Sequence, residues 1–394
     1  MKLVETPWHI FGATLVIIMG LVMAVWVGRK FELRRSRAVF LYFWHTAFCF
    51  FYVFYVLENG GDALGYYQDA LLFREWELGT AAVSVIATPF IHLFGLSFLG
   101  VNLVFNCFGV IGLLAFHGSL RSGLIGKPRW VRRLGYLVVL LPSVSFWSSA
   151  LGKDSLAFMA TGLALWSALD LRRRAVLMCT AIGVMLVVRP HMAGILLLAV
   201  GASLAFGSGV NTRRRLIFAL LVLLASAVMV PFALNYAGLR NTDSLAEIND
   251  YIEQRQGYNR EGGGSIDISS MDPVTRAFTY VFRPLPFEAH SAFALAASLD
   301  NVLLLLLAGL GAWGFLNRRK GLQGPDRIFM SWYVIACLGI LSMTTANLGI
   351  SVRQKWMFLP MLVFLLLSAT GRSRRQIPLD NEVAIPAVNK AGFS

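Results

Sequence analysis

Charged residues are scarce in this chain. Only 14% of its 394 residues are charged, whereas 57% are hydrophobic, and the mean hydropathy is +0.65. Soluble globular domains carry about 25% charged residues, so a soluble protein is excluded. Apolar runs of roughly 20 residues recur along the sequence, which is the length that an α-helix needs to cross a bilayer. We therefore expect an all-α, polytopic membrane protein.

Signatures of several other classes are missing. The four cysteines lie inside apolar runs, so we expect small buried side chains rather than disulfides or metal ligands. No nucleotide-binding glycine loop, nucleophile triad or metal cluster has diagnostic spacing. This argues against a cytosolic enzyme that uses nucleotide sugars. No small-residue cleavage site follows the first apolar segment, so no cleavable signal peptide is expected.

The apolar segments predict about eleven transmembrane helices. They are expected near residues 8–27, 38–57, 97–119, 134–150, 155–169, 175–189, 192–208, 216–235, 294–316, 328–346 and 356–370. Residues 1–370 would form one transmembrane catalytic domain. Residues 371–394 are polar and contain two prolines, which is typical of a disordered tail.

The net charge of +14 is divided unevenly between the two ends of these helices. One end collects 24 of the 35 Lys and Arg but only 5 of the 21 Asp and Glu, in residues 28–37, 120–133, 170–175, 211–215, 317–327 and the C-terminal tail. By the positive-inside rule this end is cytoplasmic, the N-terminus is external and the C-terminus is cytoplasmic. The basic excess therefore indicates membrane lipid and no nucleic acid. No ionisable residue is expected at the centre of a span, which weighs against a coupled pump.

The first external loop, residues 58–96, contains the most informative short motif. Asp62 follows two glycines, which allow backbone and substrate to approach closely. Tyr66 and Tyr67 follow it and are suited to stacking on a sugar or hydrogen bonding to it. Apolar residues at helical spacing then predict an amphipathic helix: Leu64, Leu71, Leu72 and Trp76. Residues 84–96 are short for a span, so we expect a helix at the membrane interface.

Three short external turns each carry cations between two helices. They are residues 151–155, 188–191 and 351–355. The guanidinium groups of Arg189 and Arg353 suit bidentate phosphate contacts, and ammonium groups supply point charges. The candidate substrate- or phosphate-binding residues here are Lys153, Arg189, His191, Arg353, Gln354 and Lys355.

The one long external loop covers residues 236–293. Ser244 and Glu247 form a capping box that predicts a helix there. Later in the loop, Arg283, Glu288 and His290 would either close over a substrate or only tether the loop.

The order of these features resembles the GT-C superfamily of integral membrane glycosyltransferases. The resemblance covers roughly residues 58–208. It is carried by the Gly-Asp-x-x-x-Tyr pattern at 61–66, the Phe-Gly-Leu-Ser sequence at 94–97, and the turn 148–154, which ends in an acidic residue. The chain departs from the superfamily in its short length and in lacking a sizeable soluble C-terminal domain. The Arg353–Gln354 pair also resembles repeat-unit polymerases of the EpsG or Wzy kind.

The resemblance implies a bacterial inner-membrane enzyme of cell-surface polysaccharide or glycoconjugate synthesis. It would use a polyprenyl-phosphate-linked sugar as donor and a saccharide or glycolipid as acceptor. Asp62 would be the catalytic or metal-linked carboxylate and Asp154 a second acidic group, and the need for Mg²⁺ or Mn²⁺ stays open. The chemistry is consistent, because glycosyl transfer needs a base and cations that hold the departing phosphate.

Plainer interpretations stand beside these. Asp62 would serve only as a helix N-cap, Asp69 as a solvated position on an amphipathic helix, and Lys153 with Asp154 as a local ion pair. The arginines and Lys355 would anchor to lipid headgroups. Two other functions also remain open: a repeat-unit polymerase, and a non-enzymatic flippase or transporter of lipid-linked sugars.

Overall fold

The structure is a computed structural model that describes residues 5–206, 264–268, 270–317 and 325–371, with residues 3, 213 and 220 as isolated positions. This part of the chain contains helices and no strand; its one β-type contact is an isolated bridge between Ser265 and Asn347. The α-helices are α1 (Pro7–Lys30), α2 (Arg35–Asn59), α3 (Asp62–Leu71), α4 (Thr80–His92), α5 (Phe98–Gly123), α6 (Arg129–Val139), α7 (Pro142–Ser148), α8 (Lys153–Ala168), α9 (Leu171–Val188), α10 (Pro190–Phe206), α13 (Pro273–Phe282), α14 (Ala292–Leu316), α15 (Pro325–Thr344), α16 (Leu348–Gln354) and α17 (Leu359–Ala369). Two short 3₁₀ helices, η1 (Pro286–Glu288) and η2 (Lys355–Met357), complete the set.

Five of these helices are long and apolar enough to cross a membrane: α1, α2, α5, α14 and the 327–344 part of α15. A sixth candidate is the pair formed by residues 348–357 and α17, which is bent by 69°. The all-helical membrane class is thereby supported, whereas the count of about eleven spans stays a prediction. One expected span, 216–235, lies outside the described residues. Another, 134–150, is divided into α6 and α7, because Pro142 cannot continue a helix that precedes it.

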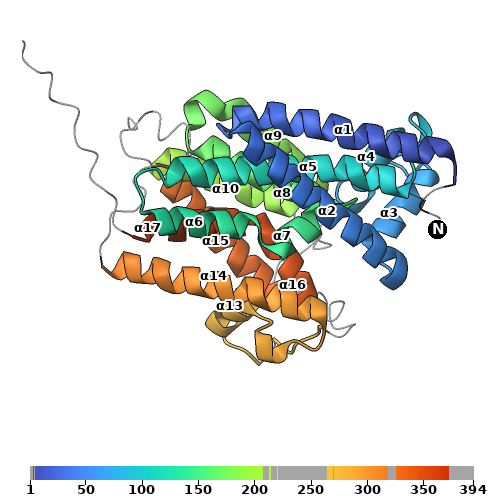
Figure 1. Cartoon of the computed structure of the whole chain (residues 1–394). Coiled ribbons are helices and arrows are strands. Elements are labelled where there is room, and N and C mark those ends of the chain that lie inside the picture. Colours follow the sequence, from blue (N-terminus) through green and yellow to red (C-terminus); the bar gives the residue numbers. More distant parts are fainter. Residues whose placement is uncertain are drawn as a thin grey trace, which may run out of the picture.

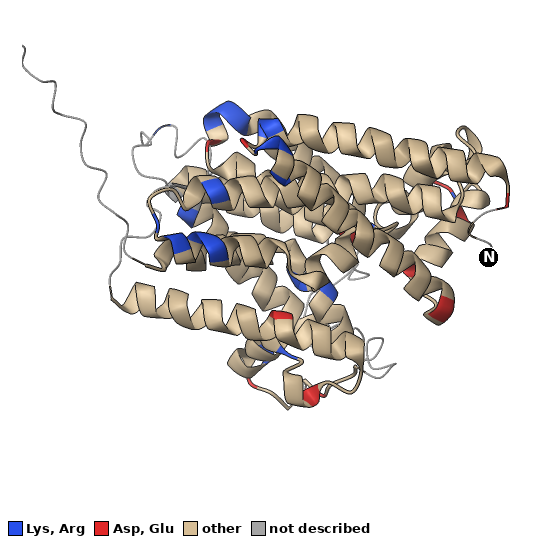
Figure 2. Cartoon of the chain, viewed as in Figure 1, with Lys and Arg blue, Asp and Glu red and all other residues tan. Residues whose placement is uncertain are grey.

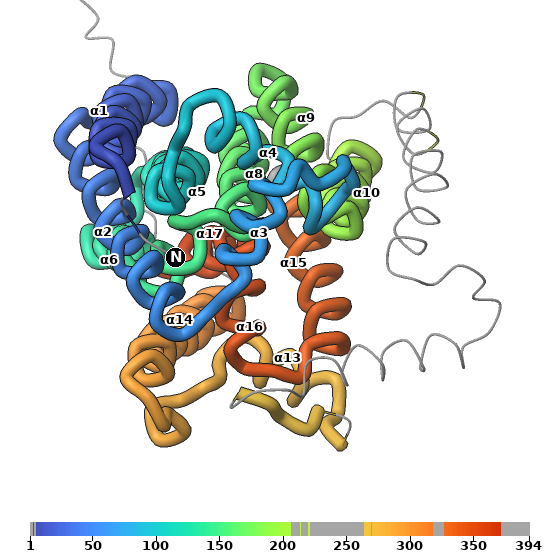
Figure 3. Tube along the Cα trace, turned by 90° about the vertical axis from the view of Figure 1, so that its right-hand side faces the viewer, coloured from blue at the N-terminus to red at the C-terminus, as the bar shows by residue number. Residues whose placement is uncertain are grey.

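Helices α5 and α8 form the centre of the bundle (Figures 1 and 3). Every residue of α8 from Ser155 to Ala168 is buried, as expected for a helix that is apolar all round. The two helices approach closely because both have glycine at their contact. A Cβ at Gly162 would lie 2.5 Å from the carbonyl oxygen of Gly112, so small residues set this packing.

The outer helices expose apolar side chains. Trp8, Ile18 and Trp26 on α1 are at least half exposed, as are Leu299 and Trp313 on α14. A soluble protein rarely exposes such faces, whereas lipid tails would cover them. Of the cysteines, Cys49 and Cys337 are buried as predicted, Cys107 is partly buried, and Cys179 is exposed on α9.

Charges separate toward the two ends of the bundle (Figure 2). Lys and Arg gather where α1 meets α2, at the end of α5 and on α6. Glu58 and Asp62 lie at the far end of α2. Helix α2 therefore carries arginines at its start and Glu58 at its end, as the loop composition predicts.

The first loop folds into α3 and α4, but its apolar face differs from the prediction. The side chains that α3 buries are Ala63, Tyr66, Tyr67 and Ala70. Leu71 is 41% exposed and Leu72 is 80% exposed, and α3 ends at Leu71. The prediction was wrong because it extended one helical pattern across the end of the helix.

Only the second part of the long loop 236–293 is described. There Asp272 caps α13, its Oδ1 accepting from the backbone N–H groups of Val274 and Thr275 at 2.9 and 3.1 Å. The helix predicted from the Ser244–Glu247 capping box lies outside the described residues, as does the tail after residue 371.

Candidate functional site

Four charged side chains from four distant parts of the chain form a continuous series of ion pairs. Arg353 Nη1 lies 2.6 Å from Asp62 Oδ2, and Arg353 Nε lies 3.3 Å from Asp154 Oδ2. Arg189 Nη2 lies 2.7 Å from Asp154 Oδ1. Side-chain exposure falls along the series, from 55% at Asp62 to 23% at Arg353, 16% at Asp154 and 8% at Arg189. The series thus leads from the surface into the bundle.

Asp62 is positioned by the break between α2 and α3. Gly60 ends α2 with a φ of +79°, a conformation that glycine adopts at little cost. The N-cap of α3 is Gly61, which makes no side-chain capping bond, and Asp62 is the first residue of the helix. The interpretation of Asp62 as an N-cap is therefore wrong. Its carboxylate is turned to Arg353 instead.

Asp154 is held by a buried polar network behind the α7–α8 turn. His45 on α2 is bonded to Asn106 on α5 at 2.6 Å and to Ser148 on α7 at 2.9 Å. Two residues before Lys153, the N–H of Leu151 donates to Asn102 Oδ1 at 2.9 Å. These bonds join α2, α5 and α7 and fix the start of α8. Asp154 then lies in the first turn of α8, where a negative charge is favourable.

Arg189 lies between α9 and α10. It is the C-cap of α9, and its N–H donates to the carbonyl oxygen of Met185 at 2.7 Å. Pro190 then begins α10, because proline suits a first helical turn. The side chain is almost fully buried against Asp154. Anchoring of Arg189 to lipid headgroups is therefore contradicted.

Arg353 lies on a short helix rather than in a turn. The predicted turn at 351–355 is wrong, since α16 continues to Gln354 and η2 follows. Asn347 caps α16, its Oδ1 accepting from the N–H groups of Gly349 and Ile350 at 2.9 and 3.3 Å. Asparagine is a favoured N-cap residue, and this signal is present in the sequence.

Lys355 is an internal anchor rather than a surface cation. It is 0% exposed, and its Nζ donates to the carbonyl oxygen of Val281 at 3.1 Å and to Asn301 Oδ1. Asp300, which is 2% exposed, accepts from the N–H of Ser143 at 2.8 Å. The headgroup interpretation of Lys355 is therefore contradicted. Asp300 lies about two turns from the start of α14 rather than at the centre of that helix.

The polar contacts of Lys355 fix the segment that carries Arg353. The next residue, Trp356, donates from Nε1 to Ser143 Oγ at 3.0 Å. Thr161 on α8 donates to the carbonyl oxygen of Met357 at 2.8 Å. Residues 355–357 are thus bonded to α7, α8, α13 and α14, and Arg353 is held two residues before them. A buried lysine with satisfied donors is a positioning residue for Arg353.

Lys153 and Tyr66 complete the surroundings of the ion pairs. Lys153 Nζ donates to Thr80 Oγ1 at 3.0 Å, so the predicted local pair with Asp154 is not formed. Burial lowers the pKa of Lys153 from 10.5 to about 8, with a further lowering from Arg189. Burial raises the pKa of Tyr66, and the carboxylates of Asp62 and Asp154 raise it further. Tyr66 therefore stays a neutral hydrogen-bond donor beside these carboxylates.

The other predicted residues form none of the ion pairs of this series. Tyr67 packs edge-on against Phe98 with ring centroids 5.4 Å apart. Asp69 pairs with Arg74 at 2.7 Å, and a third of its side chain is exposed. Gln354 Oε1 accepts a hydrogen bond from Thr345 at 3.3 Å. Arg283 and Glu288 pair with each other at 2.5 Å. His290 is exposed, and His191 is half-buried on α10.

Three aromatic residues that the sequence did not indicate border the site. Trp147 lies with its ring 5.7 Å from the Arg353 guanidinium carbon, and Tyr52 is close enough to Arg353 and Asp62 to interact electrostatically. Tyr280 is near Arg189 and Asp154, and its buried hydroxyl has no hydrogen-bond partner among the described residues. Each lies in an ordinary apolar helical pattern, so no local signal separates it from the core.

The donors at this site do not form a metal centre in the part of the chain that is described. No three His, Cys, Asp or Glu side chains come together there as a metal site would require, and both carboxylates are held by arginines.

Comparison with known proteins does not identify a family for this chain. No family model, curated protein or solved structure matches this chain.

Proposed function

We propose that this protein is a membrane glycosyltransferase that moves a sugar from a polyprenyl-phosphate-linked donor to a hydroxyl acceptor. The observation that supports it is the series Asp62–Arg353–Asp154–Arg189 at the end of the bundle opposite the arginine-rich loops. A carboxylate that is more than half exposed there is bonded directly to a guanidinium group. The carboxylate is suited to take a proton, and the guanidinium group is suited to hold a phosphate.

Arg353 is the group that a lipid phosphate would engage. Its Nη1 is bonded to exposed Asp62, whereas its Nε faces the more buried Asp154. A phosphate oxygen arriving from the membrane would compete with Asp62 for the outer edge of the guanidinium. Arginine matches phosphate geometry in bidentate fashion. The two aspartates and two arginines cancel in charge, so Lys153 supplies the positive excess that attracts an anion.

Release of Asp62 from Arg353 would make it available as a general base. The acceptor hydroxyl oxygen forms a bond to the anomeric carbon, and the hydroxyl proton passes to Asp62. The bond between the anomeric carbon and the phosphate oxygen breaks, and its electron pair leaves with the lipid phosphate. Arg353 and Lys153 stabilise that developing charge. Donor binding and activation of the base would thus be one event.

The charge distribution also supports an orientation. The arginine-rich end would face the cytoplasm, and Asp62 would face the external side of a bacterial inner membrane. This matches a polyprenyl-linked donor used in cell-surface polysaccharide or glycoconjugate synthesis. The GT-C resemblance leaves open whether Mg²⁺ or Mn²⁺ is needed.

Burial favours this function over its two alternatives. A repeat-unit polymerase would bind two lipid phosphates, but Arg189 is only 8% exposed and already bonded to Asp154. A transporter would require ionisable groups along a path through the bilayer. The buried charges Asp300 and Lys355 have protein hydrogen-bond partners, which suits an anchor better than a pathway.

The experiment compares Asp62→Asn with Asp69→Asn in purified protein. Both remove one paired carboxylate from α3, but only Asp62 belongs to the series of ion pairs. Polyprenyl-phosphate-linked glucose, galactose and mannose are supplied with saccharide acceptors, and the released polyprenyl phosphate is measured. We expect D62N to lose about 10²- to 10⁴-fold in rate, the usual contribution of a general base, and D69N to keep the wild-type rate. Release by D62N at the wild-type rate, or no release from any donor by the wild type, overturns the proposal.

A further inference from the structure

A second polar site lies at the opposite end of the bundle. A cavity of about 700 Å³ opens between the α1–α2 connection, the end of α5 and α6. Helix α2 separates it from Asp62, and its 25 residues span about 37 Å at 1.5 Å per residue. The cavity is therefore remote from the series of ion pairs, and what it binds is independent of the proposed function.

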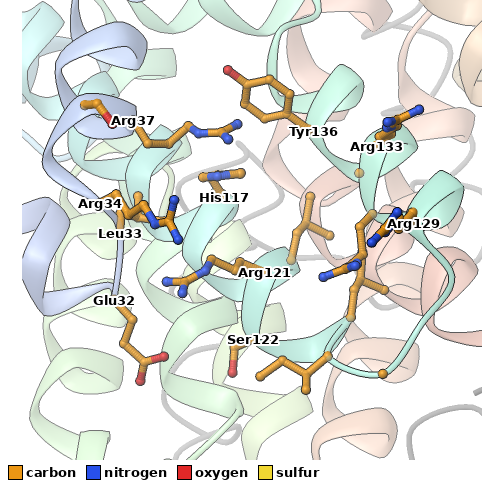
Figure 4. A pocket seen from close by; sticks show the side chains of 17 residues that line it. Glu32, Leu33, Arg34, Arg37, His117, Arg121, Ser122, Arg129, Arg133 and Tyr136 are labelled. Atoms are coloured by element: carbon orange, nitrogen blue, oxygen red, sulfur yellow. The ribbon is translucent and has the colours of Figure 1, made fainter. Parts of the chain in front are cut away.

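The walls of this cavity are strongly basic. Figure 4 shows arginines from separate elements around one space, with His117 among them. The six lining arginines are Arg34, Arg37, Arg121, Arg129, Arg132 and Arg133, and the one acidic lining residue is Glu32. None of the six forms an ion pair with a described residue. This contrasts with Arg189 and Arg353, whose charges are neutralised by carboxylates.

His117 supplies a second, independent observation. Its side chain is 8% exposed, and its Nδ1 is buried without a hydrogen-bond partner among the described residues, although the residue lines the cavity. A buried polar atom normally has a partner, because leaving it unpaired costs about 1–3 kcal/mol. A ligand with hydrogen-bonding oxygens in the cavity would satisfy it.

The arrangement of the cavity is partly fixed before any ligand binds. The Arg37 guanidinium lies over the Tyr136 ring, 4.0 Å from its centroid, and the rings of Tyr136 and His117 are 5.4 Å apart. These contacts join α2, α5 and α6. Because Arg37 is already ordered, less side-chain entropy is lost when it binds an anion.

The surroundings favour a lipid rather than a soluble anion. Helix α6 places arginines beside exposed Trp130, which is 46% exposed, and Ile125 before it is 69% exposed. A helix with basic and apolar faces is typical of the membrane interface, and basic pockets between helices bind the headgroups of anionic lipids. We propose that this cavity binds the phosphate of an anionic phospholipid headgroup.

The test uses the full-length protein in non-ionic detergent and follows its thermal unfolding during titration with cardiolipin. Phosphatidylcholine serves as the lipid control, and inorganic pyrophosphate probes binding of a free phosphate. R34Q/R121Q removes two exposed lining arginines, and R172Q/R173Q removes two exposed arginines at the same end of the bundle but outside the cavity. General attraction to a basic surface would affect both pairs equally.

We expect cardiolipin to stabilise the wild type and R172Q/R173Q alike. R34Q/R121Q should bind cardiolipin at least about tenfold more weakly, because charge-assisted hydrogen bonds to the headgroup phosphate are lost. R34K/R121K, which keeps the charge, should recover part of the affinity and exclude misfolding as the cause. Stabilisation by pyrophosphate but not by cardiolipin would overturn the lipid as ligand. No stabilisation by cardiolipin, or equal losses in the two double glutamine variants, would overturn the site.

Discussion

Asp154 is the carboxylate on which the buried half of the ion-pair series depends. It accepts from Arg189 at 2.7 Å and lies 3.3 Å from Arg353. Asp154→Asn keeps the shape of the side chain and one oxygen acceptor but removes the charge. Arg353 would retain Asp62, whereas Arg189, only 8% exposed, would lose its one described carboxylate partner. The variant therefore leaves a buried cation without a counter-charge.

The structure gives the size of the effect. Removing one partner of a buried ion pair costs about 3–5 kcal/mol, and the remaining amide oxygen places D154N near the lower end. Asp69→Asn breaks an exposed pair with Arg74 and should cost about 0–1 kcal/mol. In D154N/R189Q the unpaired cation is also removed, so the double variant should be more stable than the sum of the single changes by about 1–3 kcal/mol.

The free energy of unfolding is measured in mixed detergent–dodecyl sulfate micelles for the wild type and the four variants D154N, R189Q, D154N/R189Q and D69N. The expected order places D154N lowest among the single variants. An unfolding free energy of D154N within about 0.5 kcal/mol of the wild type, which is the usual range for a surface substitution, would refute the reasoning. Additive losses in the double variant would refute it equally.

Two further predictions concern the groups around the ion pairs. Burial lowers the pKa of Lys153 to about 8, so Lys153 loses its charge as pH rises through that value. KM for a lipid-phosphate donor should therefore increase above pH 8, and K153R, which stays charged, should abolish that increase. An unchanged pH profile would exclude Lys153 from donor binding. The same shift makes the unfolded state bind more protons between about pH 8 and 10.5, so the contribution of Lys153 to stability should rise across that window. Gly109→Ala would place a Cβ 2.0 Å from the Ser148 carbonyl oxygen and should lower both stability and activity. Gly183→Ala, whose Cβ would meet nothing within 4 Å, should leave activity unchanged. Equal Tm values for the two alanine variants would contradict the packing at the α7 turn.

The sequence predicts the class of fold and the positions of most helices because hydrophobic length and loop charge are local properties. It also identifies Asp62, Asp154, Arg189 and Arg353 as candidates, and the structure brings these four together. Their pairing could not be predicted, since it joins residues that are up to 291 positions apart. Which arginine meets which aspartate is decided by helix packing.

The misplaced residues have a physical reason in common. Lys355 was expected at the surface because it follows Arg353 and precedes an apolar segment. In the structure it is buried because Asn301 and the Val281 carbonyl accept its hydrogen bonds, and Asp300 lies nearby as a counter-charge. Burial of a charge depends on partners from other helices, which no single stretch of sequence contains.

The most direct test of the central claim is the binding of polyprenyl phosphate, the lipid product without sugar, to the wild type, D62N and R353Q. If phosphate displaces Asp62 from Arg353, removing the competing carboxylate should leave binding by D62N at least as tight as in the wild type, although D62N transfers sugar about 10²- to 10⁴-fold more slowly. R353Q should bind at least about tenfold more weakly, because a charge-assisted contact is lost. Weakened binding in D62N, or unchanged binding in R353Q, would contradict the account.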